Sequence, residues 1–294
     1  MDDVPYAFIE NVLTRLDEHY LREICYNLNA PLWTTAAETH LNKREIRNIS
    51  VLVAEDGKLF LWRSNQMWIS VEEIHRLDTR FVWIDEFTVD TYWPNTEEDG
   101  SMDELPMERF NELINFTSLV PVQKMEIKVK FSTFQNHLVK ALVLNPITTN
   151  ILTIGYSPGM EDYLKSLIAG EHVKQVALYE NWPQQIQEHV ELFLSSPQCD
   201  CLIIRGNTPR FEFNVEMLSR IIGAWKRRPA KHVLVAVPTS KDLSAEFASL
   251  MSNCPEDTVW TNGTNWFREE TDDFIFDAQC FDNHVRMTLD SLVR

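Results

Sequence analysis

The chain has 294 residues, of which 44% are hydrophobic and 24% charged, the composition of a globular protein rather than a disordered one. Its 44 acidic residues outnumber the 27 basic ones, which gives a formal charge of −17. This charge argues against partners such as the nucleic-acid backbone and anionic membranes, because both need clustered Lys and Arg. The one basic run, Lys226–Arg228, ends a predicted helix, where it complements the negative end of the helix dipole.

The N-terminal sequence and the cysteines indicate a reducing compartment. The first residues contain no basic stretch followed by an apolar run, so no signal peptide is expected. No stretch approaches the roughly 18 continuous apolar residues of a membrane span. Five cysteines, an odd number, fit a reducing environment. We therefore expect a cytoplasmic or nuclear protein.

Residues 1–47 are predicted to form a helical module of three short amphipathic helices. In the first helix, apolar residues recur every four positions, and a second row widens the stripe. Pro5 fits the first turn of this helix, where its missing N–H costs nothing, and Pro31 interrupts the helical period later on. The apolar positions are Val4, Phe8, Ile9, Val12, Leu13 and Leu16, then Leu21, Ile24, Cys25 and Leu28, then Trp33, Ala36, Ala37 and Leu41.

Residues 48–146 are predicted to form an α/β lead-in region. Two apolar runs, 49–54 and 59–62, flank the pair Asp56 and Gly57, which is a strong hairpin signal because Gly supplies the positive φ of the turn. Residues 94–106 are acidic and turn-rich with no period, so we expect an exposed loop there. The other expected elements are helical segments at 71–77, 107–116 and 134–144 and strands at 81–84 and 124–131.

Strand-like and helix-like segments alternate through residues 147–294. Successive strands start 22, 26 and 33 residues apart, and a unit of that size must stack on its neighbours to bury its apolar face. We therefore expect an α/β fold in which a leucine-rich-repeat-like stack follows the helical module, with a compact α/β domain as the alternative. The expected strands are 151–156, 173–179, 199–204 and 232–237, with helices beginning near 159, 183 and 216 and closing strands at 259–260, 266–267, 274–276 and 280–289.

No motif in the sequence predicts catalysis, a cofactor or a metal. Phosphate-binding, hydrolase, metalloprotease and kinase motifs are all missing from it. Gly155 and Gly159 lie between a strand and a helix, where α/β proteins bind phosphate, but a plain strand-to-helix turn explains them better. The acid pairs fit the general excess of acids, and Cys199 and Cys201 lack a second pair of ligands for zinc. We therefore expect a protein that is not an enzyme and holds neither a metal nor a cofactor.

Most of the nine tryptophans fall inside apolar segments, where core packing explains them. Trp93 and Trp182 differ because each stands beside a proline at the edge of a loop. These two are weak candidates for an exposed surface that contacts a target protein.

The opening Met1–Leu16 reads Val-Pro-x-x-Phe-x-x-x-Val-x-x-x-Leu from Val4 onward. It resembles the start of an F-box-like family that is greatly expanded in Caenorhabditis nematodes, and the segments 70–82, 177–183 and 192–197 also look like that family. The resemblance implies helices that bind a Skp-type adaptor of a cullin ubiquitin ligase, followed by a recognition domain. By matching positions, it assigns the adaptor contact, or the packing behind it, to Val4, Pro5, Phe8, Val12, Leu13 and Leu16. After Leu28 the sequence departs from the usual F-box pattern.

Three functions stay open from the sequence. The first is a non-enzymatic adaptor that joins a Skp-type protein to an unknown target protein. The second is a cytosolic scaffold or interaction protein without the ligase contact, in which the helices only cap the repeats. The third and least favoured is an enzyme on an α/β domain, with Gly155–Gly159 as its anchor.

Overall fold

The structure is a computed structural model that describes residues 4–63, 70–91, 101–130, 132–196, 198–205, 216–217, 219–220, 233–238, 260–261, 264–270, 274–280 and 284–291. The chain divides into two compact units, Met1–Thr149 and Asn150–Arg294. Each unit is described by itself below. Among the helices in the described ranges, none combines the length and the apolar character needed to cross a membrane.

The N-terminal unit begins with the three predicted helices, α1 (Tyr6–Thr14), α2 (Glu18–Asn27) and α3 (Pro31–Lys43). Pro5 is the N-cap of α1 and so lies one residue before the first turn, while its carbonyl accepts the N–H of Phe8 at 2.9 Å. Asp17 caps α2, because its Oδ1 accepts the N–H of Tyr20 at 3.1 Å. Pro31 is the first residue of α3, so it both stops the earlier period and starts the next helix.

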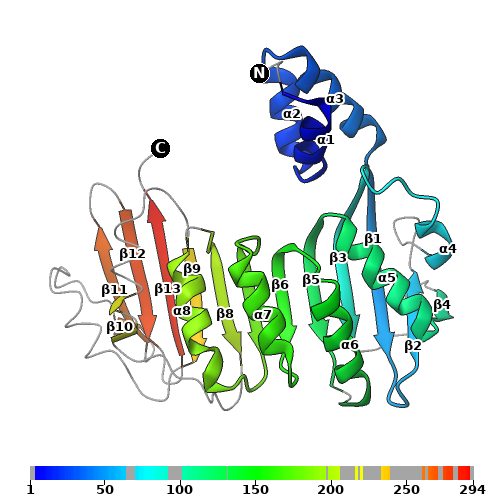
Figure 1. Cartoon of the computed structure of the whole chain (residues 1–294). Coiled ribbons are helices and arrows are strands. Elements are labelled where there is room, and N and C mark those ends of the chain that lie inside the picture. Colours follow the sequence, from blue (N-terminus) through cyan, green and yellow to red (C-terminus); the bar gives the residue numbers. More distant parts are fainter. Residues whose placement is uncertain are drawn as a thin grey trace. The chain divides into compact units, whose positions relative to one another are not determined.

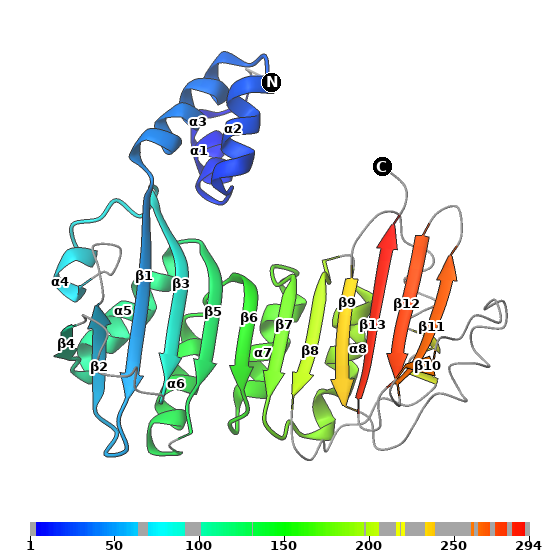
Figure 2. The same ribbon diagram turned by 180° about the vertical axis from the view of Figure 1, so that it is seen from behind.

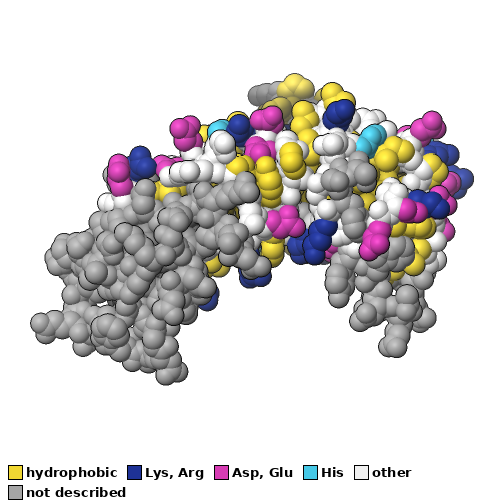
Figure 3. All heavy atoms as spheres, turned by 90° about the horizontal axis from the view of Figure 1, so that it is seen from below, with side chains coloured by type: hydrophobic (Ala, Val, Ile, Leu, Met, Phe, Trp, Pro, Cys, Tyr) yellow, Lys and Arg dark blue, Asp and Glu magenta, His cyan; other side chains and the backbone are white. Residues whose placement is uncertain are grey.

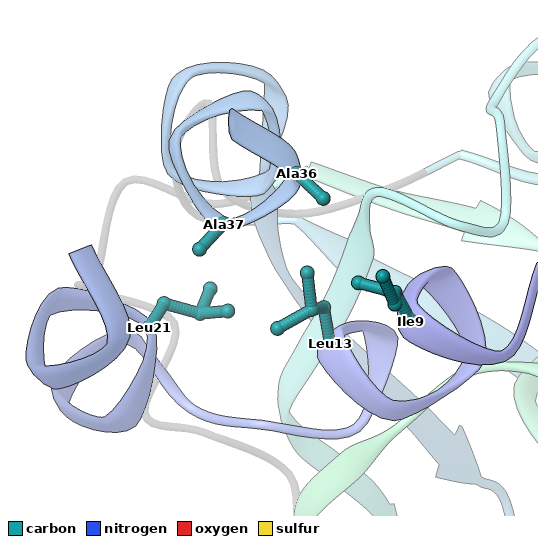
Figure 4. Packing of buried hydrophobic residues seen from close by; sticks show 5 residues of the cluster. All are labelled: Ile9, Leu13, Leu21, Ala36 and Ala37. Atoms are coloured by element: carbon teal, nitrogen blue, oxygen red, sulfur yellow. The ribbon is translucent and has the colours of Figure 1, made fainter. Parts of the chain in front are cut away.

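The three helices share a small apolar core of their own. Ile9, Leu13, Leu21, Ala36 and Ala37 are all fully buried, and their side chains converge between the helices (Figure 4). The two alanines of α3 allow close approach of the helices, because they have no side chain beyond Cβ. The partly buried residues around this core are Val4, Leu16, Ile24, Cys25, Trp33 and Leu41.

The sheet of the N-terminal unit has the strand order β5-β3-β1-β2-β4. β5, β3 and β1 run parallel, whereas β2 pairs antiparallel with both β1 and β4. The helices α5 and α6 lie on one face of this sheet, in front of it in Figure 1 and behind it in Figure 2. The elements are β1 (Glu45–Val53), β2 (Leu59–Arg63), α4 (Val71–Ile74), β3 (Val82–Asp90), β4 (Ser101–Glu104), α5 (Met107–Leu119), β5 (Val122–Lys128) and α6 (Ser132–Leu144).

The predicted hairpin is confirmed, with β1 and β2 joined through Gly57 at φ 84°. The expectation for residues 94–106 is wrong in part. Ser101–Glu104 forms the edge strand β4, although all four side chains are exposed, because its backbone pairs with β2. The rest of that loop, up to residue 100, lies outside the described residues.

The C-terminal unit continues the predicted alternation in chain order. β6, β7, β8 and β9 are parallel neighbours in that sequence, and β13, β12, β11 and β10 follow antiparallel. Residues 216, 217, 219 and 220 are helical, near the predicted third helix. The elements are β6 (Thr149–Gly155), α7 (Met160–Ala169), β7 (Gln175–Tyr179), the 3-10 helix η1 (Gln184–Ile186), α8 (Gln187–Ser195), β8 (Cys201–Arg205), β9 (Val233–Pro238), β10 (Trp260–Thr261), β11 (Thr264–Glu270), β12 (Phe274–Cys280) and β13 (His284–Ser291).

The apolar residues of these parallel strands explain the layers. Leu152, Val176 and Leu202 are aligned on one face of the sheet and are at most 2% exposed. The helices α7 and α8 lie on one side of the strands, in front in Figure 1 and behind in Figure 2. The mixed α/β class predicted from the sequence is therefore confirmed.

Candidate functional site

Helix α1 carries two adjacent apolar stripes. Ile9 and Leu13, four residues apart, point into the core and are fully buried. Pro5, Phe8 and Val12, spaced by three and four residues, form a neighbouring stripe that is exposed or half-buried, with Phe8 56% exposed. We call Pro5, Phe8 and Val12 the outer stripe. A helix needs one apolar stripe to pack on its own domain, so the outer stripe is surplus to the internal packing.

The structure separates the six residues to which the resemblance assigns adaptor contact. Leu13 lies in the core, and Val4 and Leu16 pack against that core while half-buried. Pro5 and Phe8 are exposed and Val12 is half-buried. Only the outer stripe is thus available to a partner, whereas the other three serve the packing behind it.

The charge of α1 is confined to one residue. Glu10 is the only charged side chain in this helix, and both of its carboxylate oxygens are engaged. Oε1 accepts the hydroxyl of Tyr6 at 2.6 Å, an interaction that raises the pKa of Tyr6, and Oε2 lies 3.3 Å from His40 Nε2. The outer stripe therefore carries no charge of its own, as a surface that packs in an apolar groove requires.

Two side chains near the end of α3 tie the helices to the start of β3. Arg44 donates from Nη1 to the carbonyl of Leu16 at 2.5 Å and from Nη2 to that of Leu13 at 3.0 Å, so it adds side-chain donors to two carbonyls at the end of α1. Its guanidinium also lies 5.0 Å from the centre of the Trp83 ring. Burial lowers the pKa of Arg44, because it removes water from the charged guanidinium. The hydrogen bonds and the contact with Trp83 offset this desolvation cost.

His40 is a fully buried ionisable group between α3 and α1. Its ring packs 5.1 Å from that of Phe81, and its Nδ1 has no hydrogen-bond partner among the described residues. Burial lowers the pKa of His40 below its ordinary 6.5, while Glu10 acts in the opposite direction. The folded state therefore binds the proton less readily than the unfolded chain does.

We expect the stability that depends on His40 to be complete above about pH 6.5 and to be lost as the pH falls toward the lower pKa of the folded state. Urea unfolding at about pH 7.5 and about pH 5.5 should show a loss in the wild type. In a His40→Gln variant, which keeps a side chain able to donate to Glu10, the loss should be smaller. An equal loss in both proteins would show that other groups carry the pH dependence.

A further surface, which the sequence analysis missed, is the face of β6–β9 opposite α7 and α8. The strand register aligns Thr153, Ala177, Ile203 and Ala236 across this face, and the last three are half-buried. No helix in the described ranges lies on it (Figure 2), whereas parallel sheets are ordinarily covered on both faces. We call it the open face. The alternation of Gln175–Tyr179 was the signal that could have revealed it.

Of the two tryptophan candidates, the structure describes only Trp182. Trp182 is only 2% exposed and packs edge-on against Tyr156, with ring centres 5.4 Å apart, so its assignment as an exposed contact is corrected. The proline beside it opens η1, and the turn folds the indole inward. Trp93 lies outside the described residues.

The Gly155–Gly159 turn is closed to anions by its own chain. Glu161, in the first turn of α7, accepts the N–H of Gly159 through Oε2 at 2.7 Å. Asp162 adds a second carboxylate at the same helix end. A phosphate would meet two negative charges and a backbone donor that is already used.

The cysteines and other metal-ligand types of the described residues do not gather into a site. Within the described residues, no three His, Cys, Asp or Glu lie close enough to hold a metal ion. Cys201 is partly buried, and this burial raises the pKa of its thiol.

Comparisons of the chain with protein-family models, with curated proteins and with solved structures found no match.

Proposed function

We propose that the chain is a non-enzymatic protein-interaction adaptor. In this proposal, the outer stripe of α1 docks in a groove of a Skp-type adaptor of a cullin-type ubiquitin ligase, and the α/β region binds a target protein. The observation that carries it is an uncharged stripe, with Pro5 and Phe8 exposed and Val12 half-buried, beside a fully buried one on the same short helix. Exposed apolar rows of this kind mark partner surfaces. A ligase adaptor of this type would work in the cytoplasm or nucleus.

The α/β region is proposed to be a leucine-rich-repeat-like stack that presents its open face to the target. Two features support this. Strands β6–β9 are parallel neighbours in chain order, and the described helices between them lie on one side (Figures 1 and 2). Stacked strand–helix repeats have this order, and their uncovered face commonly binds partners. A compact α/β domain stays the alternative.

The adaptor contact is tested by co-purification with a Skp-type adaptor. The expected result is a stable complex with the wild type and a loss of at least about 30-fold in affinity, or about 2 kcal/mol, in a Pro5→Ala, Phe8→Ala double variant. The loss is expected because an aromatic anchor at the centre of an interface carries much of its binding energy. The matched control is Leu192→Ala, since Leu192 is 59% exposed on α8 in the other unit. Its complex should be unchanged.

A well-folded wild type that does not bind the adaptor would overturn the ligase contact. The function would then be that of a scaffold or interaction protein whose helices are structural. One observation favours this second function: Arg44 and His40 already hold the three helices against Trp83 and Phe81 at the start of β3. An enzyme is the least supported alternative. Its anchor would be the Gly155–Gly159 turn, and Glu161 already accepts the Gly159 N–H there.

A further inference from the structure

The carboxyl ends of β6 and β7 frame a pocket of about 740 Å³ in the C-terminal unit. It lies between the turn before α7 and the loop before η1, and Figure 3 looks onto the edge where these strands end. Ligands of parallel α/β sheets bind outside the carboxyl ends of the strands, and the volume is within the range of ligand sites. The side chains on its lining that decide what it can bind are Tyr156, Glu161, Asp162, Lys165, Gln184 and Gln185.

One wall of the pocket is fixed in place. Glu161 accepts the N–H of Gly159 through Oε2 at 2.7 Å and the hydroxyl of Tyr156 through Oε1 at 3.1 Å. Tyr156 packs in turn against the buried ring of Trp182, whose Nε1–H has no acceptor within the described part of the chain. The carboxylate of Glu161 is thus held in place at the helix start. It excludes anionic ligands and favours cationic ones.

Three further side chains on the lining, those of Asp162, Gln184 and Gln185, are exposed to a ligand. The Asp162 side chain is 76% exposed, and its one ion pair, with Lys165 Nζ, is 3.4 Å long. A good charge-assisted hydrogen bond is about 2.8 Å long, so this pair is weak. The side chains of Gln184 and Gln185 are exposed and form no hydrogen bond with any described residue. One weakly paired carboxylate and two amide oxygens without a described donor therefore line the same pocket.

We propose that this pocket binds an arginine side chain of the target protein. A guanidinium carries five N–H donors in a planar fork, which suits a carboxylate with neighbouring amide oxygens, and its face stacks on aromatic rings such as Tyr156. In this complex Asp162 is the charge partner, and Gln184 and Gln185 accept the remaining N–H groups. The formal charge of −17 adds long-range attraction for a basic partner. The inference rests on the target-binding half of the proposed function and deepens it.

The ion pair between Lys165 and Asp162 predicts opposite changes in ligand affinity when either residue is replaced. Because Lys165 competes with the ligand for Asp162, Lys165→Met should tighten binding by at least about twofold, whereas Asp162→Asn should weaken it by at least about fivefold. Glu55→Gln and Lys58→Met make the same charge changes on exposed residues of the β1–β2 turn, far along the chain, and serve as matched controls. Both controls should leave the affinity unchanged within about 1.5-fold.

The experiment titrates the 15N-labelled full chain with the peptide acetyl-Gly-Ser-Arg-Ser-Gly-amide. The same peptide with citrulline, a neutral isostere of arginine, is the comparison. Saturable shifts of the Gly159 amide, the Gln184 and Gln185 side-chain amides and the Trp182 indole are expected with the arginine peptide alone. The order of affinities should be Lys165→Met, then wild type, then Asp162→Asn.

Three outcomes would overturn the inference: no shift up to about 10 mM peptide, equal binding of the citrulline peptide, or equal weakening by Glu55→Gln and Asp162→Asn. No Skp-type protein is present in this titration, so its failure is distinct from failure of the ligase contact. Binding here together with no adaptor complex would overturn only the ligase half of the proposed function.

Discussion

Replacing Leu13 by alanine is expected to lower the free energy of unfolding of the three N-terminal helices by about 3 kcal/mol. Leu13 is fully buried in the small core with Ile9, Leu21, Ala36 and Ala37 (Figure 4). The alanine removes buried apolar atoms and leaves a cavity that the short side chains of α3 cannot fill. Hydrogen exchange of the amides in α1–α3 measures the opening free energy of this part directly.

Phe8→Ala is the matched control on the same helix. Phe8 is 56% exposed, so its replacement should change the opening free energy by less than about 0.5 kcal/mol. The two variants together separate packing from docking, because the ligase proposal requires Phe8 to matter for binding and Leu13 for folding. Equal destabilisation by both would show that the outer stripe is packed within the protein, which favours the scaffold function.

Replacing Phe110 by alanine is expected to destabilise the N-terminal unit by about 4 kcal/mol. Phe110 is fully buried on α5 and meets Phe134 of α6 edge-on, with ring centres 5.3 Å apart. The loss combines the transfer of a large ring with the aromatic contact and the cavity it leaves. Urea denaturation of the full chain, followed by circular dichroism, should show a lower midpoint for the transition of this unit.

Leu119→Ala provides the comparison for Phe110. Leu119 is on the same helix but is 65% exposed, so the midpoint should stay within error of the wild type. Should Phe110→Ala also leave the midpoint unchanged, α5 and α6 would not pack through these rings. Other buried residues would then have to hold α5 and α6 on this sheet.

Much of the fold could be predicted from local patterns. The Asp56 and Gly57 pair predicts the β1–β2 hairpin, since glycine readily adopts the positive φ that Gly57 has in this turn. Alternation over 124–131 predicts a strand, and β5 forms there with its bounds at Val122–Lys128. Helix α1 follows from apolar residues at helical spacing. These elements depend on short-range geometry, which residues a few positions apart encode by themselves.

The candidate sites were harder to predict from the sequence, because they depend on which face of a helix or strand packs against a neighbouring element. Phe8 and Leu13 are both apolar residues of one helix, and their spacing does not reveal that one is exposed and the other buried. The pocket beside Asp162 arises where two loops, some 25 residues apart in the chain, meet at the ends of β6 and β7. Local sequence patterns do not report which distant loops come together in the folded chain.

By itself, the sequence determined the α/β class, the alternation of helices and strands in the second half of the chain and the absence of familiar catalytic motifs. Periodicity sets the secondary structure of a segment, and motifs are local. The tertiary structure alone decided that Ser101–Glu104 is a strand, that Trp182 is buried, and that Glu161 closes the glycine turn. Each of these is fixed by contact with a partner distant in sequence or by a backbone geometry reached only on folding. The hydrogen bonds of β4, for example, come from β2 and compensate for a segment with no strand pattern of its own.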